Sequence, residues 1–169
     1  LAAGASGRVY LALADRIDEV DDIYCLVWSA AEGWGVATNV SESEGGAYSP
    51  CIATAPDGSV GIVWNELAGS TPRIHMARST DGQAWSAAPV PHGNGSRPTL
   101  AFVSADEWCV AWQDPLEPGA ALDIFVTRYR HGAWGLPEDI SGAGTVASLW
   151  PSLAASQGRV WLAWQEGAT

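Results

Sequence analysis

The sequence predicts an all-β protein built from a four-stranded antiparallel unit that repeats along the chain, and three observations lead to this prediction. One phrase, a Pro followed by an apolar run, a turn and a second apolar run, returns along the whole chain. Its anchor residues Leu13, Trp64, Trp112 and Trp164 are 51, 48 and 52 residues apart. The runs are short and rich in β-branched and aromatic residues, with Gly and Pro between them. A period near fifty residues of this kind is typical of the blade of a β-propeller.

The four predicted strands follow one another in the same order in every repeat. The first strands are 1–3, 51–54, 99–102 and 152–155. The second and most apolar strands are 9–13, 60–64, 108–112 and 160–164. The third strands are 23–27, 74–78 and 124–128, and the fourth begin at Trp34, Trp85 and Trp134. Gly and Pro recur too often for a helical period, and a β-sandwich would not explain the constant spacing.

This count predicts a single propeller over residues 1–169 that is present as about three and a half blades. The blades are 1–47, 48–95 and 96–147, and 148–169 supplies the first two strands of a fourth. Propellers usually close with four to eight blades. We therefore expect either that the chain is an excised piece of a longer protein or that partner chains complete the ring. A twofold axis cannot divide seven blades evenly, which favours truncation or an unusual assembly over a simple dimer.

Composition excludes several classes of protein. The formal net charge is −11, with eight Arg and no Lys, so the chain is not expected to bind nucleic acid. No apolar run approaches about 18 residues, so no membrane-spanning helix is expected. The three cysteines, Cys25, Cys51 and Cys109, are odd in number and scattered in the repeat. They favour neither a disulfide framework nor a zinc site.

One turn carries a family resemblance. Between the third and fourth strands of the second repeat stands S-T-D-G-Q-A-W, residues 79–85. It resembles the Asp box of sialidase-like (BNR-repeat) propellers, S-x-D-x-G-x-x-W, shortened by one residue. The third repeat keeps a version without the Asp at 124–134, and the first keeps only Ile23, Gly33 and Trp34. The resemblance covers the chain at the level of blade rhythm.

The resemblance implies that this turn is structural. An Asp in a tight turn accepts backbone N–H bonds, Ser supports it, and the Trp packs into the sheet. The box residues are Ser79, Asp81, Gly82 and Trp85. In the family the turn lies on the face opposite the active site. The resemblance also implies an extracellular or cell-envelope location.

The same resemblance places function at the loops after the second strand and before the first strand of each blade. Two positions past the anchor, every copy has an acid: Asp15, Glu66, Asp114 and Glu166. They could form a ligand-binding or acid–base set, since glycoside hydrolysis needs paired carboxylates. Alternatively, each acid caps its strand or pairs with an Arg. We favour the structural interpretation, because catalytic residues usually break repeat symmetry.

Residues that break the repeat are the stronger ligand-binding candidates. Tyr48, Arg97 and Trp150 stand just before the recurrent Pro of their repeats. An Arg beside aromatic rings could hold a sugar carboxylate, because guanidinium binds carboxylate through two parallel hydrogen bonds. The first acidic loop, 15–22, holds five acids, and Asp18, Asp21 and Asp22 are a weak candidate set for Ca²⁺. It lacks the spacing of an EF-hand loop, so a solvated acidic loop is the favoured interpretation, and no cofactor is expected.

Sialidases of the family use three Arg, a Tyr–Glu pair and an Asp acid. This sequence offers Arg97 at one matching place, so no catalytic residue can be assigned. The leading hypothesis is a non-catalytic module that binds a glycan or a protein on its loop face. The first alternative is a piece of an exo-sialidase-like glycoside hydrolase whose other catalytic residues lie outside the chain. The second is a structural propeller built by self-association.

Overall fold

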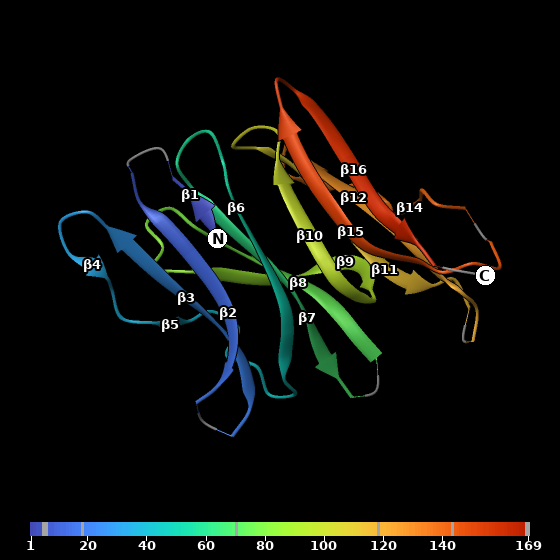
Figure 1. Ribbon diagram of the computed structural model, residues 1–169, viewed down its shortest axis with the longest axis horizontal. Coiled ribbons are helices and arrows are strands. Elements are labelled where there is room, and N and C mark those ends of the chain that lie inside the picture. Colours follow the sequence, from blue (N-terminus) through green and yellow to red (C-terminus); the bar gives the residue numbers. More distant parts are fainter. Residues whose placement is uncertain (5–6, 18, 70, 118, 143, 168–169) are drawn as a thin grey trace.

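The computed structural model describes residues 1–169 except 5–6, 18, 70, 118, 143 and 168–169. The described residues form strands and no helix, and the strands form four antiparallel sheets. The sheets follow one another in chain order across the molecule, from blue to red in Figure 1. The predicted fold class, a partial β-propeller of four-stranded blades, is confirmed.

The sheets differ in how complete they are. Sheet A contains β1 (Ala2–Ala3), β2 (Val9–Arg16), β3 (Asp21–Ser29), β4 (Gly33–Trp34) and β5 (Thr38–Asn39). Sheet B contains β6 (Ala47–Thr54), β7 (Val60–Ala68), β8 (Thr71–Ser79) and β9 (Ser86–Asn94). Sheet C contains β10 (Ser96–Phe102), β11 (Glu107–Pro115), β12 (Leu122–Arg130), β13 (Ala133–Trp134) and β14 (Glu138–Asp139). Sheet D contains β15 (Ser148–Ser156) and β16 (Arg159–Glu166).

The core lies between the sheets, because successive side chains of a strand point to opposite faces. Ile62 and Trp64 of β7 pack toward sheet A, in a cluster with Tyr10 and Ile23. Val63, between them, packs toward sheet C. A central strand is therefore apolar on both faces, which explains why the second strand of each repeat reads as a continuous apolar run.

The fourth strands differ from the prediction in sheets A and C. Each is split into two short segments, β4 and β5 or β13 and β14, instead of running on from the Trp. The hydrogen bonds between the third and fourth strands continue through the N–H groups of Gly35 and Gly135 and are then interrupted. In sheet C the interruption contains Pro137, which has no N–H to donate.

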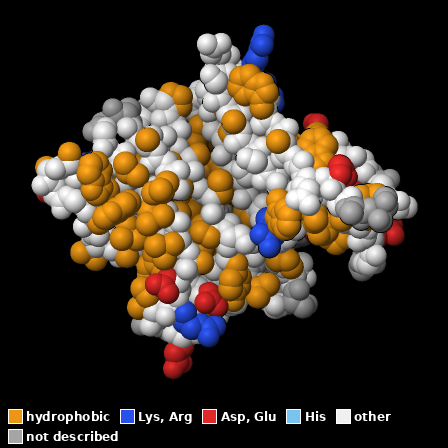
Figure 2. All heavy atoms as spheres, in the orientation of Figure 1, with side chains coloured by type: hydrophobic (Ala, Val, Ile, Leu, Met, Phe, Trp, Pro, Cys, Tyr) orange, Lys and Arg blue, Asp and Glu red, His pale blue; other side chains and the backbone are white. Residues whose placement is uncertain are grey.

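The two ends of the stack leave apolar side chains uncovered. Trp161 and Trp164 of β16 are 51% and 37% exposed, whereas Trp64 and Trp112, equivalent to Trp164, are 0% and 1% exposed. At the other end, Leu11 and Leu13 lie on the face of β2 opposite Tyr10, which packs against sheet B. Figure 2 shows hydrophobic side chains gathered over the side where β2 and β3 lie.

Candidate functional site

Each repeated Pro sits in a β-bulge at the same place in its blade. The register between the first and second strands shifts by one residue between Tyr48 and Cys51, between Ser96 and Thr99, and between Leu149 and Ser152. The residue before the Pro has a positive φ in all three bulges: 55° at Ser49, 52° at Arg97 and 51° at Trp150. The sequence analysis missed this bulge, although Pro inside a strand run is itself a bulge signal.

The bulges bring together Arg97 and Trp150, two of the residues singled out from the sequence. Cζ of Arg97 lies 5.6 Å from the centroid of the Trp150 ring, within cation–π range. Both residues are exposed, and the Trp150 side chain is 50% accessible. A guanidinium beside an indole face provides directed N–H donors next to a flat apolar surface.

A buried amide holds the Trp150 bulge in place. The Trp150 N–H donates to Oε1 of Gln113, at 2.9 Å, and Gln113 is buried at the end of β11. Asn65 is its equivalent in β7, also buried, but its Oδ1 has no partner among the described residues. The Asn side chain is one methylene shorter. Sequence reasoning singled out neither residue, although both directly follow a strand anchor.

The four repeat-equivalent acids have different surroundings. Glu66 accepts the Nε1–H of Trp64 at 3.1 Å, and Glu166 accepts the corresponding bond from Trp164 together with bonds from Ser148 Oγ. Asp114 is half-buried, and burial raises the pKa of its carboxyl above the ordinary value. Asp15 is exposed and accepts only the neighbouring Arg16 N–H among the described residues.

Tyr48 does not join the Arg97–Trp150 pair by any contact in the described part of the chain. Its hydroxyl donates to Oδ2 of Asp21 at 2.9 Å, and this bond raises the pKa of Tyr48. Arg16 Nη2 donates to the same oxygen at 3.0 Å. Tyr48 therefore ties β6 to the start of β3.

The acidic first loop is shorter than the sequence analysis assumed, because β2 runs to Arg16 and β3 starts at Asp21. Asp22 is a buried strand residue whose carboxylate accepts bonds from Ser41 Oγ, Asn39 Nδ2 and the Ser43 N–H. Burial alone would raise the pKa of Asp22, but these bonds together hold it below the ordinary value. Asp18 lies outside the described residues. Within the described part, no group of three or more acids, His or Cys is placed to hold a metal ion.

The Asp-box turn is closed by its own side chains. Asp81 Oδ1 accepts the N–H of Gln83 at 2.8 Å and of Ala84 at 3.0 Å, which lowers the pKa of Asp81. Ser79 Oγ donates to the same oxygen and accepts the Gly82 N–H at 2.8 Å. Trp85 Nε1 donates to the Gly82 carbonyl at 3.3 Å.

The fold and these bulges define the class of protein: a partial β-propeller that presents polar and aromatic side chains from bulges in β6, β10 and β15. No family model matches the sequence, and no curated protein matches it in sequence. The described residues include no helix long and apolar enough to cross a membrane.

Two solved structures resemble the chain in fold. One is a protein of unknown function from Dyadobacter fermentans, at 14% identity and a TM-score of 0.70, over 98% of this chain and 60% of that one. The other is a mutant α-L-arabinofuranosidase from Fusarium graminearum in complex with an iminosugar inhibitor, at 14% identity and a TM-score of 0.68. It aligns with 89% of this chain and 50% of that one. The chain thus spans 60% of the length of the first structure and 50% of the length of the second.

Proposed function

We propose that this chain is part of a non-catalytic, sialidase-like propeller that binds a glycan or a protein ligand on its loop face. The observation that carries the proposal is the exposed Arg97–Trp150 pair, two unlike side chains that neighbouring blades present from equivalent bulges. An exposed Arg and an exposed aromatic residue are the side chains most enriched at the centres of recognition sites. An extracellular or cell-envelope location is part of this proposal.

The acids support the non-catalytic interpretation. A glycosidase needs one carboxyl poised to give a proton and another free to attack or to activate water. Glu66 and Glu166 accept indole N–H bonds from their own strands, an arrangement that recurs with the repeat. Asp114 is the exception, since its raised pKa is what a proton donor requires.

The test is binding to an immobilised glycan array and to candidate surface proteins, followed by titration with the Arg97→Ala and Trp150→Ala variants. We expect each variant to weaken binding about ten-fold or more. Ser49→Ala, at the equivalent bulge, is the matched control and should bind as the parent does. Equal binding by the parent protein and the three variants would show that Arg97 and Trp150 do not form the ligand-binding site.

A second candidate function is a piece of a glycoside hydrolase. The likeness to an arabinofuranosidase structure, of which the chain spans 50%, favours it. The discriminating experiment is to assay p-nitrophenyl α-L-arabinofuranoside and a sialoside with a protein that contains a complete ring. Hydrolysis that is lost in the Asp114→Asn variant would support this candidate and overturn the non-catalytic proposal.

A further inference from the structure

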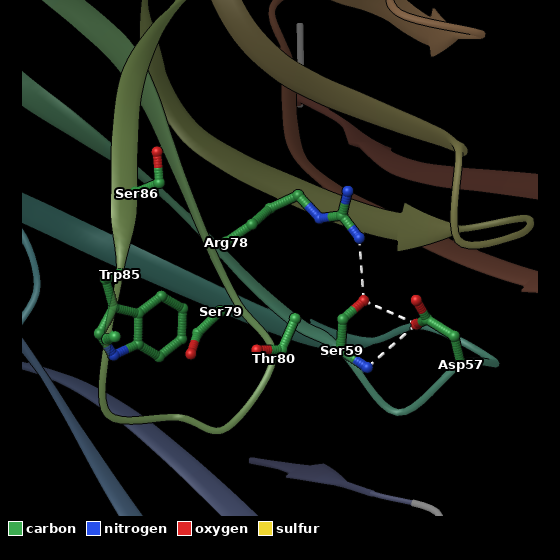
Figure 3. Close-up of a pocket in the computed structure, with 8 residues that line it drawn as sticks. Asp57, Ser59, Arg78, Ser79, Thr80, Trp85 and Ser86 are labelled. Atoms are coloured by element: carbon green, nitrogen blue, oxygen red, sulfur yellow. Dashed lines mark hydrogen bonds between the residues drawn. The ribbon is translucent and has the colours of Figure 1, made fainter.

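A hollow of about 380 Å³ opens beside the Asp-box turn, at the end of sheet B, and all the residues that line it belong to that sheet and its turns. Its polar lining comes from Asp57 and Ser59 at the turn between β6 and β7, from Arg78 and Ser79 on β8, from Thr80 in the Asp-box turn, and from Ser86 at the start of β9. The side chain of Trp85 forms another wall (Figure 3). The volume lies in the range of small-molecule sites, about 300–1,000 Å³.

The lining offers both a cation and an anion with unused hydrogen-bonding capacity. Arg78 Nη2 donates to Ser59 Oγ at 2.9 Å, and Ser59 Oγ donates to Asp57 Oδ1 at 2.7 Å (Figure 3). Among the described residues, no carboxylate forms an ion pair with Arg78, and Asp57 Oδ2 accepts no hydrogen bond. The bonds from Ser59 lower the pKa of Asp57, so its carboxylate stays ionised at neutral pH.

The positions of these groups are fixed by the surrounding structure. The Arg78 guanidinium lies over the ring of Trp108, with Cζ 4.6 Å from its centroid. Ser59 is buried, and the Trp85 indole is held by its bond to the Gly82 carbonyl. A ligand would therefore meet donors and acceptors that need little ordering on binding.

A second hollow of about 300 Å³ adjoins the first and shares Arg78 and Ser86 with it. Its other walls are largely aromatic: Trp108, Tyr129 and Trp134. Trp108 and Tyr129 are stacked with centroids 3.9 Å apart, and Trp134 meets Tyr129 edge-on at 5.3 Å. The two hollows thus adjoin at Arg78 and Ser86, and together we treat them as one groove. Its first part lies on sheet B and contains an indole, and its second part lies at the seam between sheets B and C and contains an aromatic cluster.

We propose that this groove, here named the seam groove, binds a neutral oligosaccharide of at least two sugar units. Sugar hydroxyls both donate and accept, so they can serve Asp57 Oδ2 and the Arg78 guanidinium at once, through charge-assisted bonds. An anion would be attracted by Arg78 but opposed by Asp57 and by the net charge of −11. The apolar face of a sugar ring matches the flat walls of Trp85 and of the aromatic cluster.

The seam groove is independent of the loop-face site in its residues. It lies at the end of the blades that carries the Asp-box turn, and its lining does not include Arg97, Trp150 or Gln113. It therefore goes beyond the function proposed above, and either site can fail without the other.

The test is calorimetric titration of the protein with cellotetraose, xylotetraose and mannotetraose, and with tetragalacturonate as an anionic comparison, at millimolar concentrations. We expect at least one neutral tetrasaccharide to bind, and Asp57→Asn and Arg78→Gln each to weaken it about ten-fold. Trp34→Ala removes the equivalent exposed Trp of the first blade and should leave binding unchanged. Arg97→Ala should also leave it unchanged.

Three results would overturn the seam groove as a glycan site. One is no heat with any neutral tetrasaccharide. Another is tighter binding of tetragalacturonate than of every neutral one. The third is binding that Arg97→Ala weakens and Asp57→Asn does not, which would assign the sugar to the loop face. If Arg78→Gln fails to fold, the exposed Asp57 decides alone, because Asp57→Asn keeps the side-chain shape.

Discussion

Burial acts to raise the pKa of Asp22 and of Asp114, but the two carboxyls end with opposite shifts. Asp22 has three hydrogen-bond donors and a lowered pKa, whereas Asp114 is desolvated and has a raised pKa. The lowered pKa of Asp22 contributes stability at neutral pH that is lost as the pH falls below about 4. The raised pKa of Asp114 acts in the reverse sense, because its stability contribution is present at low pH and lost as the pH rises.

We predict that Asp114→Asn stabilises the protein at neutral pH, because the amide has no charge to desolvate. The gain should be less than about 1 kcal/mol, since the site is half open to water. It should vanish as the pH falls below about 4, where the carboxyl is protonated in both states. Urea unfolding at both pH values measures it. Asp15→Asn, at the exposed equivalent, is the control, and an equal gain there would contradict the desolvation argument.

Ser79 closes the Asp-box turn from a buried position. Its buried hydroxyl accepts the N–H of Asp81 and of Gly82, and it also orients the Asp81 carboxylate. We predict that Ser79→Ala lowers the free energy of unfolding by about 1–3 kcal/mol, because the buried Gly82 N–H loses its acceptor.

Urea unfolding measures the effect of Ser79→Ala, and glycan binding on the loop face should be unchanged. Ser104→Ala is the matched control, since Ser104 makes a similar pair with Asp106 in an exposed turn. If the two variants unfolded at the same urea concentration, burial of the turn would not be what makes Ser79 matter.

At the scale of the strand, the preceding blade supports the Trp150 bulge but not the Arg97 bulge. Gln113 supplies an acceptor for the Trp150 N–H, but Asn65 is too short to provide the equivalent bond and leaves its own Oδ1 unpaired. We predict that Asn65→Gln stabilises the second and third blades by about 1 kcal/mol, by reaching the N–H of Arg97.

The reciprocal variant, Gln113→Asn, should destabilise by a similar amount, because it recreates the unpaired amide at the next seam. Thermal unfolding of both variants gives the comparison. A loss of stability in both would mean that the site around Asn65 has no room for the extra methylene.

Strand order and blade rhythm could be predicted because Trp64, Trp112 and their flanking apolar residues repeat with the structure. The breaks in the fourth strands could not be predicted from the sequence. Gly35 and Gly135 still donate their N–H groups to the third strand, and each strand is interrupted only after them.

The loop-face candidates were predicted in part. Arg97 and Trp150 were named, but their contact depends on a register shift, which residue types alone do not encode. Gln113 and Asn65 were missed because a polar residue next to a strand anchor usually faces solvent.

At the scale of the whole molecule, the sheets at the two ends of the stack leave apolar side chains uncovered. Sheet D has two strands, and no described residue pairs with the outer edge of β16. Its Trp161 and Trp164 occupy positions that neighbouring strands bury in sheets B and C. An open edge beside exposed indoles favours association with another sheet.

We predict that the isolated chain self-associates, so that sedimentation gives a mass above 17.7 kDa that rises with concentration. Trp161→Lys places a charge on the exposed end and should shift the distribution toward one chain. Trp150→Ala, an exposed Trp of the loop face, is the control and should not. A single species of one-chain mass at all concentrations would rule out a propeller closed by copies of this chain.

The recurrent bulge has an evolutionary consequence. Because the Pro, the positive φ and the register shift stay constant while the residue before the Pro is Ser, Arg or Trp, the backbone does not dictate that side chain. Sheets B, C and D thus each offer one interchangeable display position on a rigid frame. A new ligand preference could arise by exchanging these few residues, at little cost to folding, in the way that variable loops diversify on a conserved scaffold.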